Sequence, residues 1–143
     1  MKYQHILDFW FSDEAQPFWF EKNSDFDALI HKKFYQIHQK ASQVELWTWR
    51  TNIQGRLAEI IILDQFSRNL FRDSPQAFLQ DPLALAIAQE AVLLGLDQQL
   101  PEKQRCFLYL PFMHSESKLI HETALELFTR LGNANNLEFE KKA

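Results

Sequence analysis

The chain has 143 residues and a formal net charge of −4, with a sequence pI near 5.7. This length predicts one domain with its own hydrophobic core, and we expect a single helical domain over residues 1–143. Massed Lys and Arg residues, which hold nucleic acid by its phosphates, are lacking, so no nucleic-acid partner is expected. No apolar run approaches the roughly 20 residues of a membrane span, so no membrane partner is expected either.

Few residues interrupt the chain: it has only three glycines and five prolines. With no alternating β-branched segments, this composition predicts an all-α fold of six to seven helices. The single cysteine excludes a disulfide framework. The N-terminal MKYQHILDFWF does not resemble a signal peptide, so we expect a cytoplasmic protein.

The first half of the chain shows two helix patterns. Residues 3–11 form the first, and the FWF triplets at 9–11 and 18–20 are predicted to be core anchors. Ser24, followed by Asp27, resembles a capping box that starts the second helix. The apolar face of that helix is Phe26, Leu29, Ile30, Phe34, Ile37 and Ala41. Its predicted solvated face is His31, Lys32, Gln36, Gln39 and Lys40.

The second half begins with a packed connection over 44–53 and a central helix from about 52 to 71. Ser74 with Pro75, and Asp81 with Pro82, each place a capping side chain before a proline and predict two further helices.

Pro101 starts the next predicted helix, which Pro111 is expected to break after Leu110. The last clear helix covers 116–131 and stops at Gly132. Beyond it, a polar linker over 133–136 and the apolar Leu137 and Phe139 predict the start of another helix.

Polar residues interrupt the apolar central helix. Asp64 and Arg68 share one face at i, i+4, and Gln65 and Asn69 share the adjacent face. Because unpaired buried charges cost several kcal/mol, these groups should be paired or should open onto a water-filled cleft.

A second polar group, His114, Ser115 and Glu116, lies within LPFMHSESK. Ser115 is the predicted N-cap of the final helix. We expect this segment to meet the central helix, with Glu116 or His114 completing the shell of polar partners around Arg68, Asn69 or Arg72.

The stretches LAEIIILDQFSRNLFR, SPQAF with the following Asp81, and FLYLPFMHSE resemble an uncharacterised bacterial helical family, domain of unknown function 924. The resemblance runs from ILDFWF at 6–11 to HSE at 114–116. It implies a tetratricopeptide-like fold of antiparallel helix pairs, as a right-handed array or bundle, although the sequence has no 34-residue repeat.

The chain departs from that family pattern in two ways. Ser67 replaces the proline of the DQFPRN motif, which implies a straighter helix. The family's FGRFPHRN-like segment is absent, so we expect the chain to lack a C-terminal helical segment and any part of a site that this segment builds.

Three functions are compatible with the polar residues. The first is a binding module, in which the arginines hold an anionic small molecule or peptide. Four of the six arginines (Arg50, Arg56, Arg68 and Arg72) fall in a stretch with only two acids, Glu59 and Asp64. The second is a hydrolase or transferase, with His114 as general base, Ser115 as nucleophile, and Asp64 and Glu116 as paired carboxylates. The third is a purely structural ion-pair network.

Other chemistries have less support. No HExxH, ExxH or glycine-rich phosphate motif is present, so neither a metal nor a cofactor is expected. His5, His31 and His38 are predicted to lie on the surface. A further alternative is a homo-oligomer formed through an exposed patch of Trp10, Trp19, Trp47 and Trp49. The competing interpretation is that all four side chains are buried within the monomer.

Overall fold

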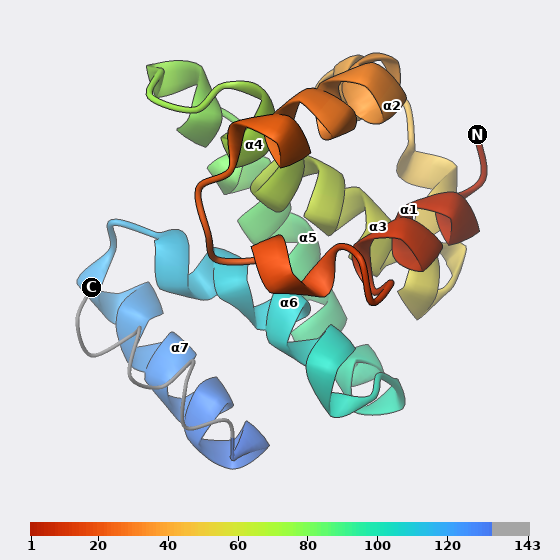
Figure 1. Ribbon diagram of the computed structural model, residues 1–143. Coiled ribbons are helices and arrows are strands. Elements are labelled where there is room, and N and C mark those ends of the chain that lie inside the picture. The colour runs from red at the N-terminus through yellow and green to blue at the C-terminus, as the bar shows by residue number, and fades with distance from the viewer. Residues whose placement is uncertain (133–143) are drawn as a thin grey trace.

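A computed structural model describes residues 1–132 of the chain, and most of these residues are helical (Figure 1). No strand occurs among these residues, which confirms the predicted all-α class. The predicted linker at 133–136 and the helix start at Leu137 and Phe139 lie outside the described residues. The elements are α1 (Tyr3–Trp10), η1 (Gln16–Phe18), α2 (Ser24–Ser42), η2 (Trp47–Thr51), α3 (Ile53–Ile61), η3 (Ile62–Phe66), α4 (Ser67–Leu70), η4 (Pro75–Phe78), α5 (Asp81–Leu93), η5 (Leu96–Gln99), α6 (Glu102–His114) and α7 (Lys118–Leu131).

The central helix is α3, η3 and α4, which follow one another without a break from residue 53 to residue 70. It packs against α1, α2, α5 and α6, so nearly all of its side chains are buried. This burial on all sides explains why apolar residues occur all round its circumference. With this helix counted once, residues 1–132 contain six helices besides the short 3₁₀ turns, which agrees with the predicted number.

Aromatic side chains form the core beside this helix. Trp10 is 1% exposed, and its ring meets Phe66 and Phe107 edge-on at centroid distances of 5.7 and 5.6 Å. The second FWF triplet behaves differently, because Phe20 is 54% exposed whereas Trp19 packs against the core. The first triplet is therefore a core anchor and the second only partly so.

The four tryptophans do not form one exposed patch. Trp10 is buried, Trp19 and Trp49 are partly buried against the core, and only Trp47 is largely exposed. The exposed patch required by the alternative of self-association through these four side chains is therefore not present.

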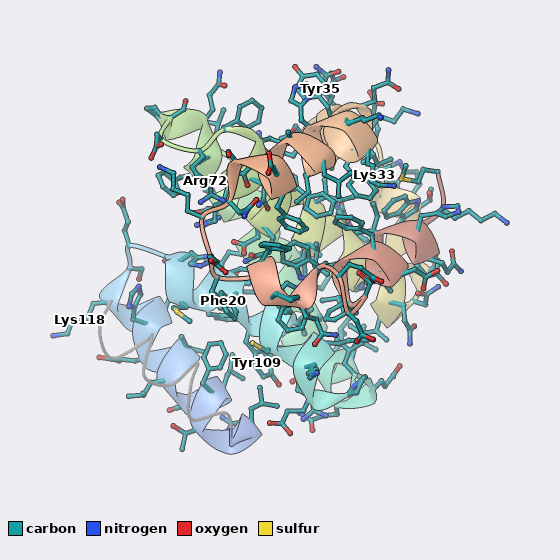
Figure 2. The ribbon with its side chains drawn as sticks, in the orientation of Figure 1. Phe20, Lys33, Tyr35, Arg72, Tyr109 and Lys118 are labelled. Atoms are coloured by element: carbon teal, nitrogen blue, oxygen red, sulfur yellow. The ribbon has the colours of Figure 1, made fainter. Side chains whose placement is uncertain are left out.

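Helix α7 packs on α6 at one edge of the molecule (Figure 1). Figure 2 shows Tyr109 between these two helices, and its ring meets Phe128 edge-on at 5.9 Å. The stacking of helix pairs as in tetratricopeptide arrays remains a prediction.

The prediction that Pro111 ends helix α6 is wrong, because the helix continues to His114. A proline in a helix interior removes one hydrogen bond and costs about 3 kcal/mol. Leu108, Leu110 and Phe112 around it are all at most 3% exposed. The burial of these side chains offsets the cost, so the helix runs on past the proline.

Three predicted caps are displaced in the structure. The N-cap of α5 is Gln80 rather than Asp81, which is the first residue of the helix and whose carboxylate accepts from Arg68 instead. The N-cap of α2 is Asn23, whose Oδ1 accepts from the Phe26 N–H at 2.9 Å, and Ser24 already lies in the helix. The N-cap of α7 is Ser117 rather than Ser115. At the starts of α2 and α7, two residues close in sequence can serve as caps, and sequence alone does not choose between them.

Two predictions of side-chain burial on α2 are also wrong. Leu29, which the pattern predicts on the apolar face, is 39% exposed, and His38, which it predicts on the surface, is 4% exposed. The Nε2 of His38 lies 2.7 Å from the Ser67 hydroxyl oxygen. That contact gives the buried imidazole a hydrogen-bond partner, which explains how this histidine can lie in the core.

Candidate functional site

The site begins at η3, a π-helical turn inside the central helix. Such turns are rare, cost hydrogen-bond geometry and occur often at functional sites. Asp64 and Gln65 lie in this turn, and Asp64 is fully buried. The widened turn therefore carries the buried acid, and the straighter helix implied by Ser67 stays a prediction.

Asp64 accepts hydrogen bonds from three side chains. Gln65 Nε2 donates to Oδ2 at 2.8 Å. Arg68 Nη1 lies 3.3 Å and His114 Nδ1 2.8 Å from the other oxygen, Oδ1. Burial raises the pKa of Asp64, but the charge and hydrogen bond of His114, with Arg68 and Gln65, outweigh it and hold that pKa below its usual range. Asp64 is therefore an ionised carboxylate, and His114 donates to it through Nδ1–H.

Arg68 is held by a second acid as well. Its Nη1 and Nη2 donate to the two oxygens of Asp81 at 2.9 and 3.0 Å, a bidentate pair. The guanidinium carbon also lies 5.2 Å from the centre of the Phe78 ring. Burial lowers the pKa of Arg68, but Asp64 and Asp81 raise it further, so the group stays charged.

Arg72 and Asn69 converge on Asp27 of α2. Arg72 Nε and Nη2 donate to its two oxygens at 2.6 and 2.9 Å, and Asn69 Nδ2 donates at 2.8 Å. Burial raises the pKa of Asp27, but the hydrogen bonds from Arg72 and Asn69 lower it more, so its net pKa is below the usual range. This acid ties the end of the central helix to the start of α2, where Figure 2 places Arg72.

Two hollows meet at this cluster. The central hollow has a volume of about 400 Å³. The lateral hollow beside it is larger, with a volume of about 1180 Å³. Arg68, Met113 and His114 line both. The central hollow is lined by Trp19, Phe20, Glu21, Lys22, Gln65, Arg68, Asn69, Arg72, Leu110, Met113 and His114. The lateral hollow is lined by Arg68, Phe78, Asp81, Pro82, Leu85, Pro111, Met113, His114, Ser115, Glu116, Ser117, Lys118 and His121.

The structure brings six of the eight predicted site residues together: Asp64, Gln65, Arg68, Asn69, Arg72 and His114 all line the central hollow or contact a residue that does. The 114–116 segment meets the central helix as expected, but through His114 and Asp64 rather than through an arginine. Ser115 and Glu116 line only the lateral hollow. Glu116 is exposed, and within the described residues the acids that pair with Arg68 are Asp64 and Asp81.

Two acids that build the site, Asp27 and Asp81, are absent from the predicted set. Both stand at helix starts, where an acid is already explained by the helix dipole. The signal that could have identified Asp81 is the surplus of donors on Arg68, which Asp64 alone cannot satisfy.

The other two arginines of the arginine-rich stretch lie outside both hollows. Arg50 donates to both oxygens of Glu59 at 2.7 and 2.8 Å, and Arg56 pairs with Glu90 at 2.5 Å. These pairs connect η2 with α3 and α3 with α5, as expected if these two arginines join elements.

Within the described range, no group of three or more His, Cys, Asp or Glu side chains is arranged to hold a metal ion. The same residues include no helix with the length and apolar character needed to cross a membrane.

Comparisons with known proteins give a family and a structural relative. The model of the family described as "Bacterial protein of unknown function (DUF924)" matches residues 6–143. The solved structure of the protein of unknown function ATU0120 from Agrobacterium tumefaciens is similar, with 36% sequence identity and a TM-score of 0.91. That similarity covers 98% of this chain and 78% of the other. A search of curated proteins gave no match.

Proposed function

This chain belongs to the bacterial family of unknown function DUF924, and on that premise we propose that it binds a small organic acid, or the acidic end of a peptide, in the central hollow. The residues that line the hollow support this. Trp19, Phe20, Leu110 and Met113 give it an apolar wall, and its other lining residues are all polar. Ligand sites in proteins commonly combine an apolar surface with a few directed polar groups.

The observation that carries the proposal is the way Arg72 is held. Asp27 accepts from Nε and Nη2 and so fixes the plane of the guanidinium. The third nitrogen, Nη1, has no hydrogen-bond partner among the described residues, and Arg72 lines the hollow. A fixed guanidinium with spare donors is suited to a carboxylate, because little side-chain entropy is lost on binding.

The charge balance of the cluster narrows the class of ligand. The guanidiniums of Arg68 and Arg72 face three carboxylates, those of Asp27, Asp64 and Asp81. Such a cluster does not attract a multiply charged phosphate over a distance. It favours a ligand with one carboxylate and an apolar body, held by directed hydrogen bonds and by contact with the aromatic wall.

A thermal-shift screen of the full chain tests this proposal, with phenylacetate, indole-3-acetate, benzoate and inorganic phosphate as probes. An acid at 100 times its Kd stabilises the native state by about 2.7 kcal/mol, which raises Tm by several degrees. We expect the aromatic acids to do this and phosphate not to.

Two matched variants locate the binding. Arg72→Lys keeps the charge but loses the fixed donor plane, and we expect it to weaken acid binding at least tenfold. Arg50→Lys alters an equivalent bidentate pair outside the hollow and should leave binding unchanged. Equal responses from the two variants, or no response of the wild-type chain to any acid, would contradict the proposal.

The second candidate is a purely structural role for the cluster. It is favoured because each arginine of the arginine-rich stretch already pairs with an acid. In that case Asp64→Asn or Arg68→Met lowers stability, as removal of one partner of a buried pair does. No acid in the screen then binds the wild-type chain.

We also propose that the protein works in the cytoplasm. The support is its single cysteine, Cys106, which is buried in α6 and leaves no pair for a disulfide. Fractionation of bacterial cells that express the full chain tests this, and recovery in the periplasm would contradict it.

A further inference from the structure

His114 is placed as general bases are placed in enzymes. It is the last residue of α6, its side chain is 22% exposed, and it lines both hollows. Its Nδ1–H is fixed by Asp64 at 2.8 Å, so in the neutral ring the lone pair is on Nε2. That nitrogen has no partner among the described residues. A buried acid therefore holds the ring in one tautomer, with a free acceptor beside two hollows.

Asp64 is built to orient this ring rather than to take its proton. Gln65 Nε2 and Arg68 Nη1 also donate to the carboxylate, at 2.8 and 3.3 Å, and these bonds stabilise its charged form. An ionised, buried acid favours the imidazolium that forms when Nε2 takes up a proton.

Arg68 supplies a third group at the same place. Its Nη1 and the His114 ring approach the same carboxylate oxygen, Asp64 Oδ1, so the guanidinium and the imidazole are neighbours. Asp64 and Asp81 engage Nη1 and one hydrogen of Nη2, which leaves Nε–H and the second Nη2 hydrogen without partners among residues 1–132. These donors can hold an oxygen atom that becomes negatively charged.

We propose that this site hydrolyses carboxylic esters, with His114 as the catalytic base. The proposal rests on the proposed function, since the organic acid that the hollow binds is then the product of the reaction. The apolar wall of Trp19 and Phe20 would receive the acyl part of an ester with an aromatic or aliphatic acid.

The reaction has two steps. His114 Nε2 takes a proton from a water molecule as the water oxygen bonds to the carbonyl carbon, and the carbonyl electron pair moves to the oxygen beside Arg68. The tetrahedral intermediate then re-forms the carbonyl and breaks its bond to the alcohol oxygen, which takes the proton from Nε2. Ester and water become carboxylic acid and alcohol, and His114 returns to its neutral form.

The test measures initial rates of hydrolysis of p-nitrophenyl phenylacetate and p-nitrophenyl acetate by the full chain and its variants. His114→Asn keeps a donor for Asp64 but removes the base, and we expect the rate to fall at least about 100-fold. His31→Asn removes an exposed imidazole on the outer side of α2 and should leave the rate unchanged, which controls for nonspecific imidazole catalysis.

Asp64→Asn tests the positioning residue. We expect kcat to fall while KM for the phenylacetate ester stays within about twofold, because Asp64 does not contact the ester. A purely structural role would change the melting temperature without this separation of kcat from KM.

The outcomes separate the two proposals. If phenylacetate stabilises the wild-type chain and His114→Asn equally, but hydrolysis is absent or is unchanged in His114→Asn, the esterase inference is overturned and the binding function stands. If hydrolysis depends on His114 and phenylacetate inhibits it, the inference is supported. Failure of phenylacetate to bind at all contradicts the proposed function itself.

Discussion

Val44 is a residue whose backbone conformation does not suit its side chain. Its φ is +61°, and it follows the C-cap of α2, with its N–H donating to Ala41 and the next N–H, of Glu45, donating to Lys40. These two bonds form a Schellman motif, in which glycine usually takes the left-handed position. A β-branched residue there is strained by roughly 1 to 2 kcal/mol.

Val44→Gly should therefore stabilise the protein. We expect the free energy of unfolding in urea to rise by roughly 1 kcal/mol, after the greater flexibility of the unfolded glycine chain is subtracted. Val92→Gly, in the helical backbone of α5, should lower stability instead. A loss of stability in Val44→Gly would show that its side-chain contacts outweigh the strain.

Gly55 has the opposite constraint, because its neighbours leave no room for a side chain. A Cβ added at Gly55 would overlap the backbone carbonyl of Trp49, where α3 packs on η2. Gly55→Ala should lower the free energy of unfolding by about 3 kcal/mol, as overpacking does.

Gly95 provides the comparison. Its φ is +73° and a Cβ there would meet nothing within 4 Å, so Gly95→Ala tests backbone strain alone and should cost about 1 kcal/mol. Equal losses in the two variants, measured by urea denaturation, would contradict the account of a closed space at Gly55.

At the level of elements, the start of α2 gives a test of helix capping. Asn23 accepts from the Phe26 N–H, whereas Ser24 is exposed and its side chain makes no hydrogen bond among the described residues. Asn23→Ala should cost about 1 kcal/mol of stability, and Ser24→Ala, the residue that the sequence pattern favours, only a few tenths. Thermal melts of the two variants distinguish these caps, and a larger loss in Ser24→Ala would reverse the assignment.

The elements show which kinds of pattern can be predicted. The predicted central helix, from about 52 to 71, matches the observed helix over 53–70 to within about a residue at each end, because an apolar run flanked by polar residues determines it. The π-turn η3 was missed, since one extra residue in a turn leaves no trace in composition or in a short periodic pattern. The end of α6 was missed because the burial that carries the helix past Pro111 is a tertiary effect.

At the scale of the whole molecule, tertiary packing determines which polar side chains pair with each other. The cost of burying charge predicts that the 114–116 segment meets the central helix, a constraint that a sequence can reveal. It does not predict the partner, because His114 contacts Asp64 rather than an arginine. The partners Asp27 and Asp81 lie 45 and 13 residues from the arginines they bind, and each has a local explanation at a helix start. Only the packing of α2 and α5 against the central helix selects them.

The buried polar groups also determine how the stability of the whole molecule depends on pH. Burial lowers the pKa of His38 to about 4 from 6.5 in the unfolded chain. The unfolded state therefore binds the proton first, and stability is full above pH 6.5 and falls as the pH drops from 6.5 to 4. The loss is on the order of 3 kcal/mol. Asp27 and Asp64, whose pKa values are lowered, add a second loss below about pH 3.8, as their carboxylates become protonated.

His38→Gln separates these two windows. Glutamine keeps a donor for the Ser67 hydroxyl but does not titrate, so its free energy of unfolding should be nearly constant between pH 6.5 and 4. The loss below pH 3.8 should remain, since Asp27 and Asp64 are unchanged. His31→Gln, which alters an exposed ring on the same helix, should retain the wild-type slope in urea denaturation series across this range. Parallel curves for wild type and His38→Gln would mean that the buried ring is not what destabilises the fold in mild acid.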